Sequence, residues 1–132
     1  MKKVIQIFRQ AIIEDSAGKL RAIGCTENNL NEQITKKTAV MICEALTQYR
    51  KNKYFYIAAA DSAAYWEPEL SSNEQVVVEV YRFKRTVLAY ANNIEVAEMI
   101  YEALTQYREA RKESDDYTYF YYDASEYFGG DD

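Results

Sequence analysis

Two segments of the chain carry the same apolar pattern at helical spacing. The positions at this spacing are Thr38, Ile42, Leu46 and Tyr49 in the first segment and Val96, Ile100, Leu104 and Tyr107 in the second. Residues three or four apart share one face of a helix, so each segment presents one stripe to a core. Residues 44–50 and 102–108 also read the same seven letters, Glu-Ala-Leu-Thr-Gln-Tyr-Arg. The pattern predicts two matching amphipathic helices within a duplicated unit.

Each predicted helix is followed by an aromatic run that is typical of a strand. Residues 54–57 read Tyr-Phe-Tyr-Ile, and residues 119–122 read Tyr-Phe-Tyr-Tyr. Side chains alternate between the two faces of a strand, so we match the two runs position by position. The predicted core positions are then Phe55, Ile57, Phe120 and Tyr122. Tyr119 and Tyr121 are predicted to point away from the core.

A strand is also expected before each helix. Residues 5–9, Ile-Gln-Ile-Phe-Arg, match residues 78–82, Val-Glu-Val-Tyr-Arg. Residues 15–18 form a turn signal followed by a returning strand at 20–25. The second hairpin is predicted to turn near 83–85, one long bent strand being the alternative. Each copy is therefore β-β-α-β. The expected fold class is α+β, a tandem β-β-α-β repeat forming a mostly antiparallel sheet with two helices on one face.

The length of 132 residues predicts a single domain. The two copies are expected to span about 3–66 and 75–128, which leaves 129–132 as an acidic tail. The sheet face opposite the helices would be rich in Tyr. We expect that face to be exposed or to form a homodimer interface.

The absence of histidine narrows the chemistry that the chain can perform. It excludes an imidazole base, a Ser-His or Cys-His pair and a His metal ligand. Cys25 and Cys43 form no CxxC motif, and two thiols do not complete a zinc site. Asp61 and Asp123 follow the two aromatic runs, and we interpret them as turn residues rather than paired catalytic carboxylates. We therefore expect a non-enzymatic protein with no cofactor and no metal.

No part of the sequence reads as a signal peptide or a membrane span. The N-terminal apolar run is interrupted by Arg9 and Gln10. We expect a cytoplasmic protein with reduced thiols, a Cys25–Cys43 disulfide being the alternative.

Charge divides the chain into two parts. Residues 1–112 carry all 16 Lys and Arg together with 14 acids, whereas residues 113–132 carry seven acids, seven aromatics and no base. Carboxylates along a rigid surface can imitate a phosphate backbone, and aromatic rings can occupy base-binding surfaces. We predict that this segment binds a protein partner with a basic surface, the alternative being a solubilising end whose rings pack inside. The candidate partner-binding residues are Asp115, Asp116, Tyr119, Tyr121, Asp123, Glu126, Tyr127, Asp131 and Asp132.

A second candidate site comes from two arginines. Arg9 and Arg82 each follow an aromatic residue at matched positions of the predicted strands. Arg pairs with phosphate and aromatic rings stack on bases, so two such positions suit a small anionic nucleotide. The alternative is edge-strand charge that discourages aggregation. The residues of this candidate ligand site are Phe8, Arg9, Tyr81, Arg82, Lys84 and Arg85.

In size and composition the chain resembles the small acidic proteins that phages use to disable bacterial defence, such as anti-CRISPR or anti-restriction inhibitors. The resemblance is one of type, without a shared motif. The leading hypothesis is a non-enzymatic inhibitor that blocks a basic, nucleic-acid-handling partner. The alternatives are a module that binds or sequesters a small anionic nucleotide and a structural homo-oligomer. Direct nucleic-acid binding fits poorly, because the net charge is −5.

Overall fold

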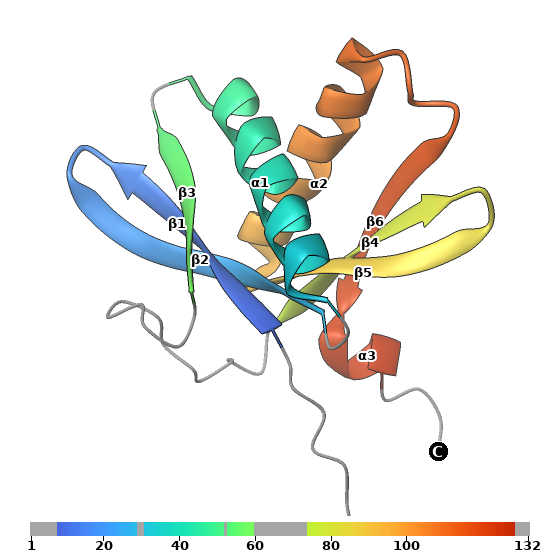
Figure 1. Ribbon diagram of the computed structural model, residues 1–132, viewed down its shortest axis with the longest axis horizontal. Helices are drawn as coiled ribbons and strands as arrows, with labels where there is room; N and C mark the ends of the chain where they lie inside the picture. Colours follow the sequence, from blue (N-terminus) through green and yellow to red (C-terminus); the bar gives the residue numbers. More distant parts are fainter. Residues whose placement is uncertain (1–7, 29–30, 52, 60–73, 129–132) are drawn as a thin grey trace, which may run out of the picture.

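Six strands form one antiparallel sheet in the computed structural model, which describes residues 8–28, 31–51, 53–59 and 74–128. The strand order is β3-β1-β2-β5-β4-β6 (Figure 1). The strands are β1 (Phe8–Ser16), β2 (Lys19–Asn28), β3 (Tyr54–Ala59), β4 (Gln75–Tyr81), β5 (Lys84–Ala91) and β6 (Tyr117–Asp123). The helices are α1 (Glu32–Tyr49), α2 (Ile94–Ala110) and the short α3 (Ala124–Phe128). The predicted α+β class with an antiparallel sheet is confirmed.

Both ends of the sheet are built from the same succession of elements. A hairpin comes first, a helix follows, and the next strand pairs with the outer side of the first hairpin strand, β3 with β1 and β6 with β4. The pairing within each hairpin shifts by one residue, at Ile12/Ile13 and at Val77/Val78. Such shifts mark β-bulges, which strengthen the local twist of a strand pair. Figure 1 shows the two hairpins turning away from each other to opposite sides of the molecule.

Each hairpin closes in a two-residue turn with a left-handed backbone. Ala17 and Gly18 have φ angles of 54° and 84°, and Arg82 and Phe83 have φ angles of 48° and 71°. Two successive positive φ angles are typical of the type I′ turn, whose twist matches that of the strands. The first predicted turn is confirmed, and the second falls at Arg82-Phe83 rather than at 83–85. Bulky residues strongly disfavour this backbone, so the second turn is strained.

We expect the double substitution Arg82→Asn with Phe83→Gly to raise the free energy of unfolding by about 1–2 kcal/mol, because Asn-Gly adopts this turn without strain. Urea denaturation followed by circular dichroism measures the change. Arg82→Ala keeps the left-handed backbone without the charge, and it should change the free energy of unfolding by less than about 0.5 kcal/mol. A double variant no more stable than the parent would show that the turn stores no strain.

The larger of two clusters of buried apolar side chains is called the main core here, and the two predicted helical stripes lie at its centre. Their fully buried positions are Ile42, Leu46, Ile100 and Leu104. Asn31 and Asn93 directly precede the two helices, and their side chains accept hydrogen bonds from backbone N–H groups of the first turn. Such capping satisfies donors that a helix start otherwise leaves unpaired. α1 contacts β1, β2 and β3, and α2 contacts β4, β5 and β6.

The two long helices also pack against each other. The Tyr49 hydroxyl at the end of α1 donates to Glu102 in the middle of α2. Met41 in the middle of α1 accepts a contact at 3.3 Å from the Arg108 guanidinium near the end of α2. The hydrogen bond to Glu102 raises the pKa of Tyr49, with a smaller contribution from burial. The copies of the seven-letter sequence therefore lie side by side.

The two halves of the sheet meet at a short seam between β2 and β5. Two residue pairs form it, Gly24 opposite Ala91 and Cys25 opposite Tyr90. Asn92 adds two hydrogen bonds to β2, at 3.0 Å from its backbone N–H and 2.7 Å from its side chain. At Gly24 the strands approach so closely that a Cβ would lie 2.3 Å from the Tyr90 carbonyl oxygen.

The predicted faces of β6 are wrong. Tyr119 is only 2% exposed and Tyr121 packs against the main core, whereas Phe120 is 39% exposed. Phe120 and Tyr122 therefore lie on the face of β6 opposite to Tyr119 and Tyr121. When positions are counted from the pairing shift in each hairpin, Tyr119 occupies the place in β6 that Phe55 occupies in β3. The sequence comparison matched Phe55 with Phe120, so it was wrong by one residue. A shift of one residue moves every side chain of a strand to the other face.

The strands β1 and β4 are buried on both faces. Ala11, Ile13, Val76 and Val78 lie on one face, and each is fully buried. They alternate along β1 and β4 with residues of the main core, such as Ile12 and Val77. The expectation of an exposed face is therefore wrong for these two strands.

Candidate functional site

Tyr119 belongs to a part-buried network centred on Arg108. The Arg108 Nε donates to the Tyr119 hydroxyl at 2.9 Å, and this hydroxyl donates to Glu79 Oε2 at 2.9 Å. The guanidinium also pairs with Glu113 at 2.8 Å and lies 3.6 Å from the centroid of the Tyr117 ring. Tyr119 therefore has no surface to offer a partner, and its predicted role in binding is replaced by a structural one.

Arg108 keeps its positive charge within this network at neutral pH. Burial alone would lower the pKa of the Arg108 guanidinium, but its hydrogen bonds to Tyr119 and Glu113 raise that pKa above the ordinary value. Burial raises the pKa of Tyr119, and the hydrogen bond from Arg108 offsets part of that rise. The network ties β6 to β4 and to the end of α2, so it fixes the orientation of the strand.

The outward side of β6 carries an aromatic ladder made of Phe120, Tyr122 and Tyr127. The ring centroids are 6.3 Å apart between Phe120 and Tyr122 and 5.5 Å apart between Tyr122 and Tyr127, and both pairs are stacked. Tyr127 comes from α3, which directly continues β6. β6 is the last strand in the sheet order, so the ladder lies at the sheet edge. Stacked aromatic rings offer a large contact area with few torsions left to freeze on binding.

Acidic side chains lie beyond both ends of the aromatic ladder. Asp115 and Asp116 are exposed in the turn before β6, and Glu126 is exposed on α3. The strand between them spans about 20 Å at about 3.3 Å per residue. Asp123 is partly buried and accepts a hydrogen bond from Gln75. The remaining predicted acids, Asp131 and Asp132, lie outside the described residues.

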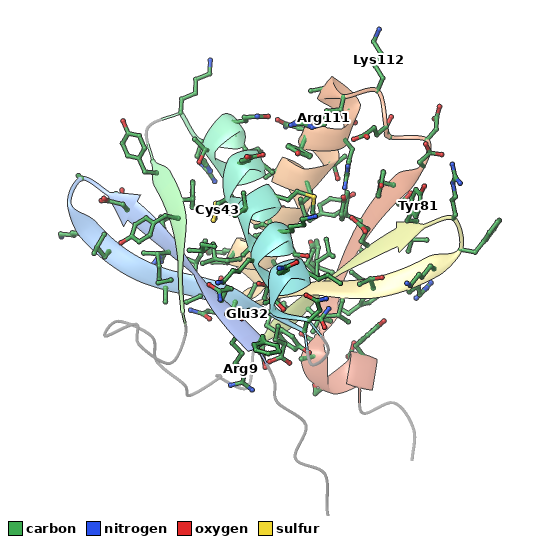
Figure 2. All side chains as sticks on the ribbon, in the orientation of Figure 1. Arg9, Glu32, Cys43, Tyr81, Arg111 and Lys112 are labelled. Atoms are coloured by element: carbon green, nitrogen blue, oxygen red, sulfur yellow. The ribbon has the colours of Figure 1, made fainter. Side chains whose placement is uncertain are left out.

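The structure separates the two arginines of the candidate ligand site. Arg9 lies near the start of β1, beside the half-buried Phe8, and pairs with Glu27 at 2.9 Å. Arg82 lies in the turn between β4 and β5. Figure 2 shows Arg9 below the centre of the sheet and Tyr81 on the outlying hairpin. The predicted equivalence of Arg9 and Arg82 is therefore wrong, and they form no common site.

The second half of that candidate site is an exposed hairpin tip. The Arg82 guanidinium lies 5.1 Å from the centroid of the Tyr81 ring, and Lys84 and Arg85 are exposed beside it. Phe83 between these cations is 100% exposed. The sequence analysis did not identify Phe83 as an exposed aromatic residue. The one indication in the sequence was that residues which disfavour turns occupy the predicted turn.

Neither metal binding nor thiol chemistry finds support in the described part of the chain. There, no group of three or more His, Cys, Asp or Glu side chains could hold a metal ion. Cys25 and Cys43 are buried and free, so the alternative of a disulfide is not realised. Burial raises the pKa of each thiol to about 12, which keeps both protonated and unreactive at neutral pH. Asp61 lies outside the described residues, so its relation to Asp123 stays a prediction.

Comparison with known proteins adds no relative from which a site could be transferred. No protein-family model, curated protein or solved structure matches the chain. Within the described ranges, no helix is both long and apolar enough to cross a membrane. The candidate site is therefore defined by geometry, as the aromatic ladder at the edge of the sheet together with the flanking acids.

Proposed function

We propose that the protein is a non-enzymatic interaction protein that binds a basic, nucleic-acid-handling protein. The contact is made by the β6 surface, which we define as Asp115, Asp116, Phe120, Tyr122, Glu126 and Tyr127. The observation that carries this proposal is the stacked aromatic ladder between two groups of exposed acids. The β6 surface replaces Tyr119 and Tyr121 of the sequence-based site with Phe120 and Tyr122.

The β6 surface combines two contributions to binding. The aromatic ladder supplies apolar area of the kind that dominates interface energies. The acids supply long-range attraction to a Lys- and Arg-rich groove, which raises the association rate and makes the affinity fall with salt. A partner groove that accepts phosphates and stacked bases offers both complements, so the β6 surface would compete with nucleic acid.

We also propose that the chain is a tandem duplication of a β-β-α-β unit with both helices on one sheet face. Three features support it: the shared seven-letter sequence, the equal succession of elements, and a pairing shift at the corresponding place in each hairpin. The β6 surface then belongs to the second copy only. The first copy carries no acid at the position before β3 that corresponds to Asp115 or Asp116.

The partner class follows from the resemblance in size and composition to phage inhibitors of bacterial defence. A nuclease or other nucleic-acid-binding protein of a bacterial cytoplasm is therefore the first kind of partner to test. Such a partner has the basic groove that the β6 surface complements.

The test compares Phe120→Ser with Tyr54→Ser, a matched control because Tyr54 is an exposed aromatic on the opposite edge strand. The parent protein is used to capture partners from a bacterial lysate. The captured partners are then purified and titrated by biolayer interferometry. We expect Phe120→Ser to weaken binding by about 10- to 100-fold and Tyr54→Ser to leave it within about twofold. Asp115→Asn with Asp116→Asn should make the decline of affinity with salt shallower.

Two outcomes would overturn the proposal. One is an affinity that does not fall between low and high salt, and the other is a partner that binds its nucleic acid and this protein at once. Light scattering of the free protein addresses the homodimer alternative. A dimer that dissociates in Phe120→Ser would assign the β6 surface to self-association rather than to a basic partner.

A further inference from the structure

A groove between α1 and β3 lies on the opposite side of the molecule from the β6 surface. Its volume is about 410 Å³, within the usual range for small-molecule sites. Apolar side chains line most of it, including Val40 and Cys43 from α1 and Phe55 and Ile57 from β3. Figure 2 shows Cys43 on the side of α1 that faces β3.

The other half of the sheet shows what chemistry fits such a groove. Cys43 directly precedes the first copy of the seven-letter sequence, and Tyr101 directly precedes the second. Ile57 pairs with Ile12 before the shift in the first hairpin, and Tyr121 pairs with Val77 before the shift in the second. Where the first half has a thiol and an aliphatic side chain, the second half therefore has two phenol rings.

Those two rings contact each other directly. The Tyr101 and Tyr121 rings meet edge to face with centroids 5.6 Å apart, and both pack against the main core. This arrangement is favourable for aromatic pairs. The α1–β3 groove thus lies at the corresponding place in the first half of the sheet, where Cys43 and Ile57 stand in place of the two rings. An aromatic ring from a bound molecule would restore the missing contacts.

Charge decides what substituent the ring should carry. Glu44 is the charged residue that lines the groove. It is exposed, and among the described residues it forms no ion pair. The Thr47 hydroxyl already donates to the Cys43 carbonyl at 2.8 Å, so it is satisfied within the helix. The rim therefore favours a cation over an anion.

We propose that the α1–β3 groove binds a small cationic aromatic molecule, with one aromatic ring between α1 and β3 and an ammonium group at Glu44. The groove is separate from the β6 surface, so this site can exist whether or not the protein binds a basic partner. Cys43 contributes apolar surface rather than a nucleophile, because burial raises the pKa of its thiol to about 12. No covalent step is involved.

Tyramine is the probe that tests the proposal, with binding followed by ¹H–¹⁵N chemical-shift changes. We expect saturable shifts along α1 and β3 with a Kd on the order of 1 mM, typical for so small a ligand. Cyclohexylethylamine, which lacks the aromatic ring, should bind at least about threefold more weakly. 4-Hydroxyphenylacetate, which replaces the ammonium by a carboxylate, should not reach saturation.

Variants separate the groove from other surfaces. Cys43→Tyr rebuilds the ring of the other half inside the groove and should weaken tyramine at least about tenfold. Gln33→Tyr adds the same ring at an exposed position of α1 that does not line the groove, and it should bind tyramine within about twofold of the parent. Glu44→Gln should weaken tyramine by several-fold without affecting phenol. If Cys43→Tyr does not fold by circular dichroism, Ile57→Phe fills the groove from the strand side.

The reciprocal variant Tyr101→Cys opens the second half and should create additional tyramine shifts along α2 and β6. The proposal is overturned by a parent protein that shows no shifts at 10 mM tyramine. It is equally overturned by binding that persists when the groove is filled, or by equal affinity for the cationic and the anionic probe.

Discussion

Gly24→Ala is expected to lower the free energy of unfolding by about 3 kcal/mol, at the upper end of what overpacking a core costs. The added Cβ would lie 2.3 Å from the Tyr90 carbonyl oxygen and 3.2 Å from the Ala91 Cα. Both atoms belong to the backbone of β5, so no side-chain rotation can relieve the clash. The strand itself must move away from β2.

The consequence is large because the seam is short. Two residue pairs join β2 to β5, and Gly24 belongs to one of them. Displacing β5 there also strains the two hydrogen bonds from Asn92 to β2. We therefore expect urea denaturation of Gly24→Ala to show both a lower midpoint and a broader transition, since the halves of the sheet lose part of their coupling.

Gly18→Ala is the matched control. Gly18 has a positive φ of 84°, but a Cβ there would meet nothing within 4 Å. Its cost should be backbone strain of about 1 kcal/mol without a broader transition. Equal costs at the two glycines would show that the seam can open at no extra penalty.

Local patterns predicted much of this fold. The stripes ending in Tyr49 and Tyr107 identified both long helices, and the turn signal around Gly18 identified the first hairpin. These features depend on residues close in sequence. The seam at Gly24 depends on the approach of a strand that lies some 65 residues later in the chain, and no local pattern reports it.

The sequence could not predict which face of β6 is buried, and the reason is different. Residues 117–123 read Tyr-Thr-Tyr-Phe-Tyr-Tyr-Asp, so both faces carry aromatic rings and no polar alternation sets the register. The candidate site inherits this ambiguity. Acids such as Asp115 and Glu126 are exposed, whereas Tyr119 was predicted outside and is buried, and Phe120 was predicted inside and is exposed.

The predicted equivalence of Arg9 and Arg82 is wrong because it rested on similar neighbouring residues and not on the position of the hairpin turn. Arg9 and Arg82 share an aromatic neighbour, but Arg82 lies at a hairpin tip and Arg9 near a strand start. The seven-letter copies show the same limit. Arg50 and Arg108 have identical preceding residues, yet one is exposed and the other has a side chain only 12% exposed.

Arg108→Ala should lower the free energy of unfolding by about 3 kcal/mol, in the range found when one partner of a buried ion pair is removed. Glu79 would keep a carboxylate with 16% side-chain exposure and lose its cation, and Tyr117 would lose the guanidinium against its ring. Arg50→Ala should change the free energy of unfolding by less than about 0.5 kcal/mol. Chemical denaturation of both variants measures the difference.

The pH dependence offers an independent measurement on the same network. The pKa of Tyr119 is higher in the folded protein than its ordinary value near 10, chiefly because the residue is buried. The stability linked to this group is therefore complete below about pH 10 and declines as pH rises further, since the unfolded chain ionises first. Tyr119→Phe should be less stable at pH 7 and should lose less stability than the parent between pH 10 and 11.

Replacing both charges tests whether the unpaired carboxylate causes the loss. Arg108→Met with Glu79→Gln leaves no buried charge, so it should recover part of the stability that Arg108→Ala loses. A double variant as unstable as Arg108→Ala would assign the loss to packing around Tyr117 rather than to charge. If Arg50→Ala proved as costly as Arg108→Ala, the cost would come from the shared helix sequence, and the network would not be what holds β6 with Phe120 turned outward.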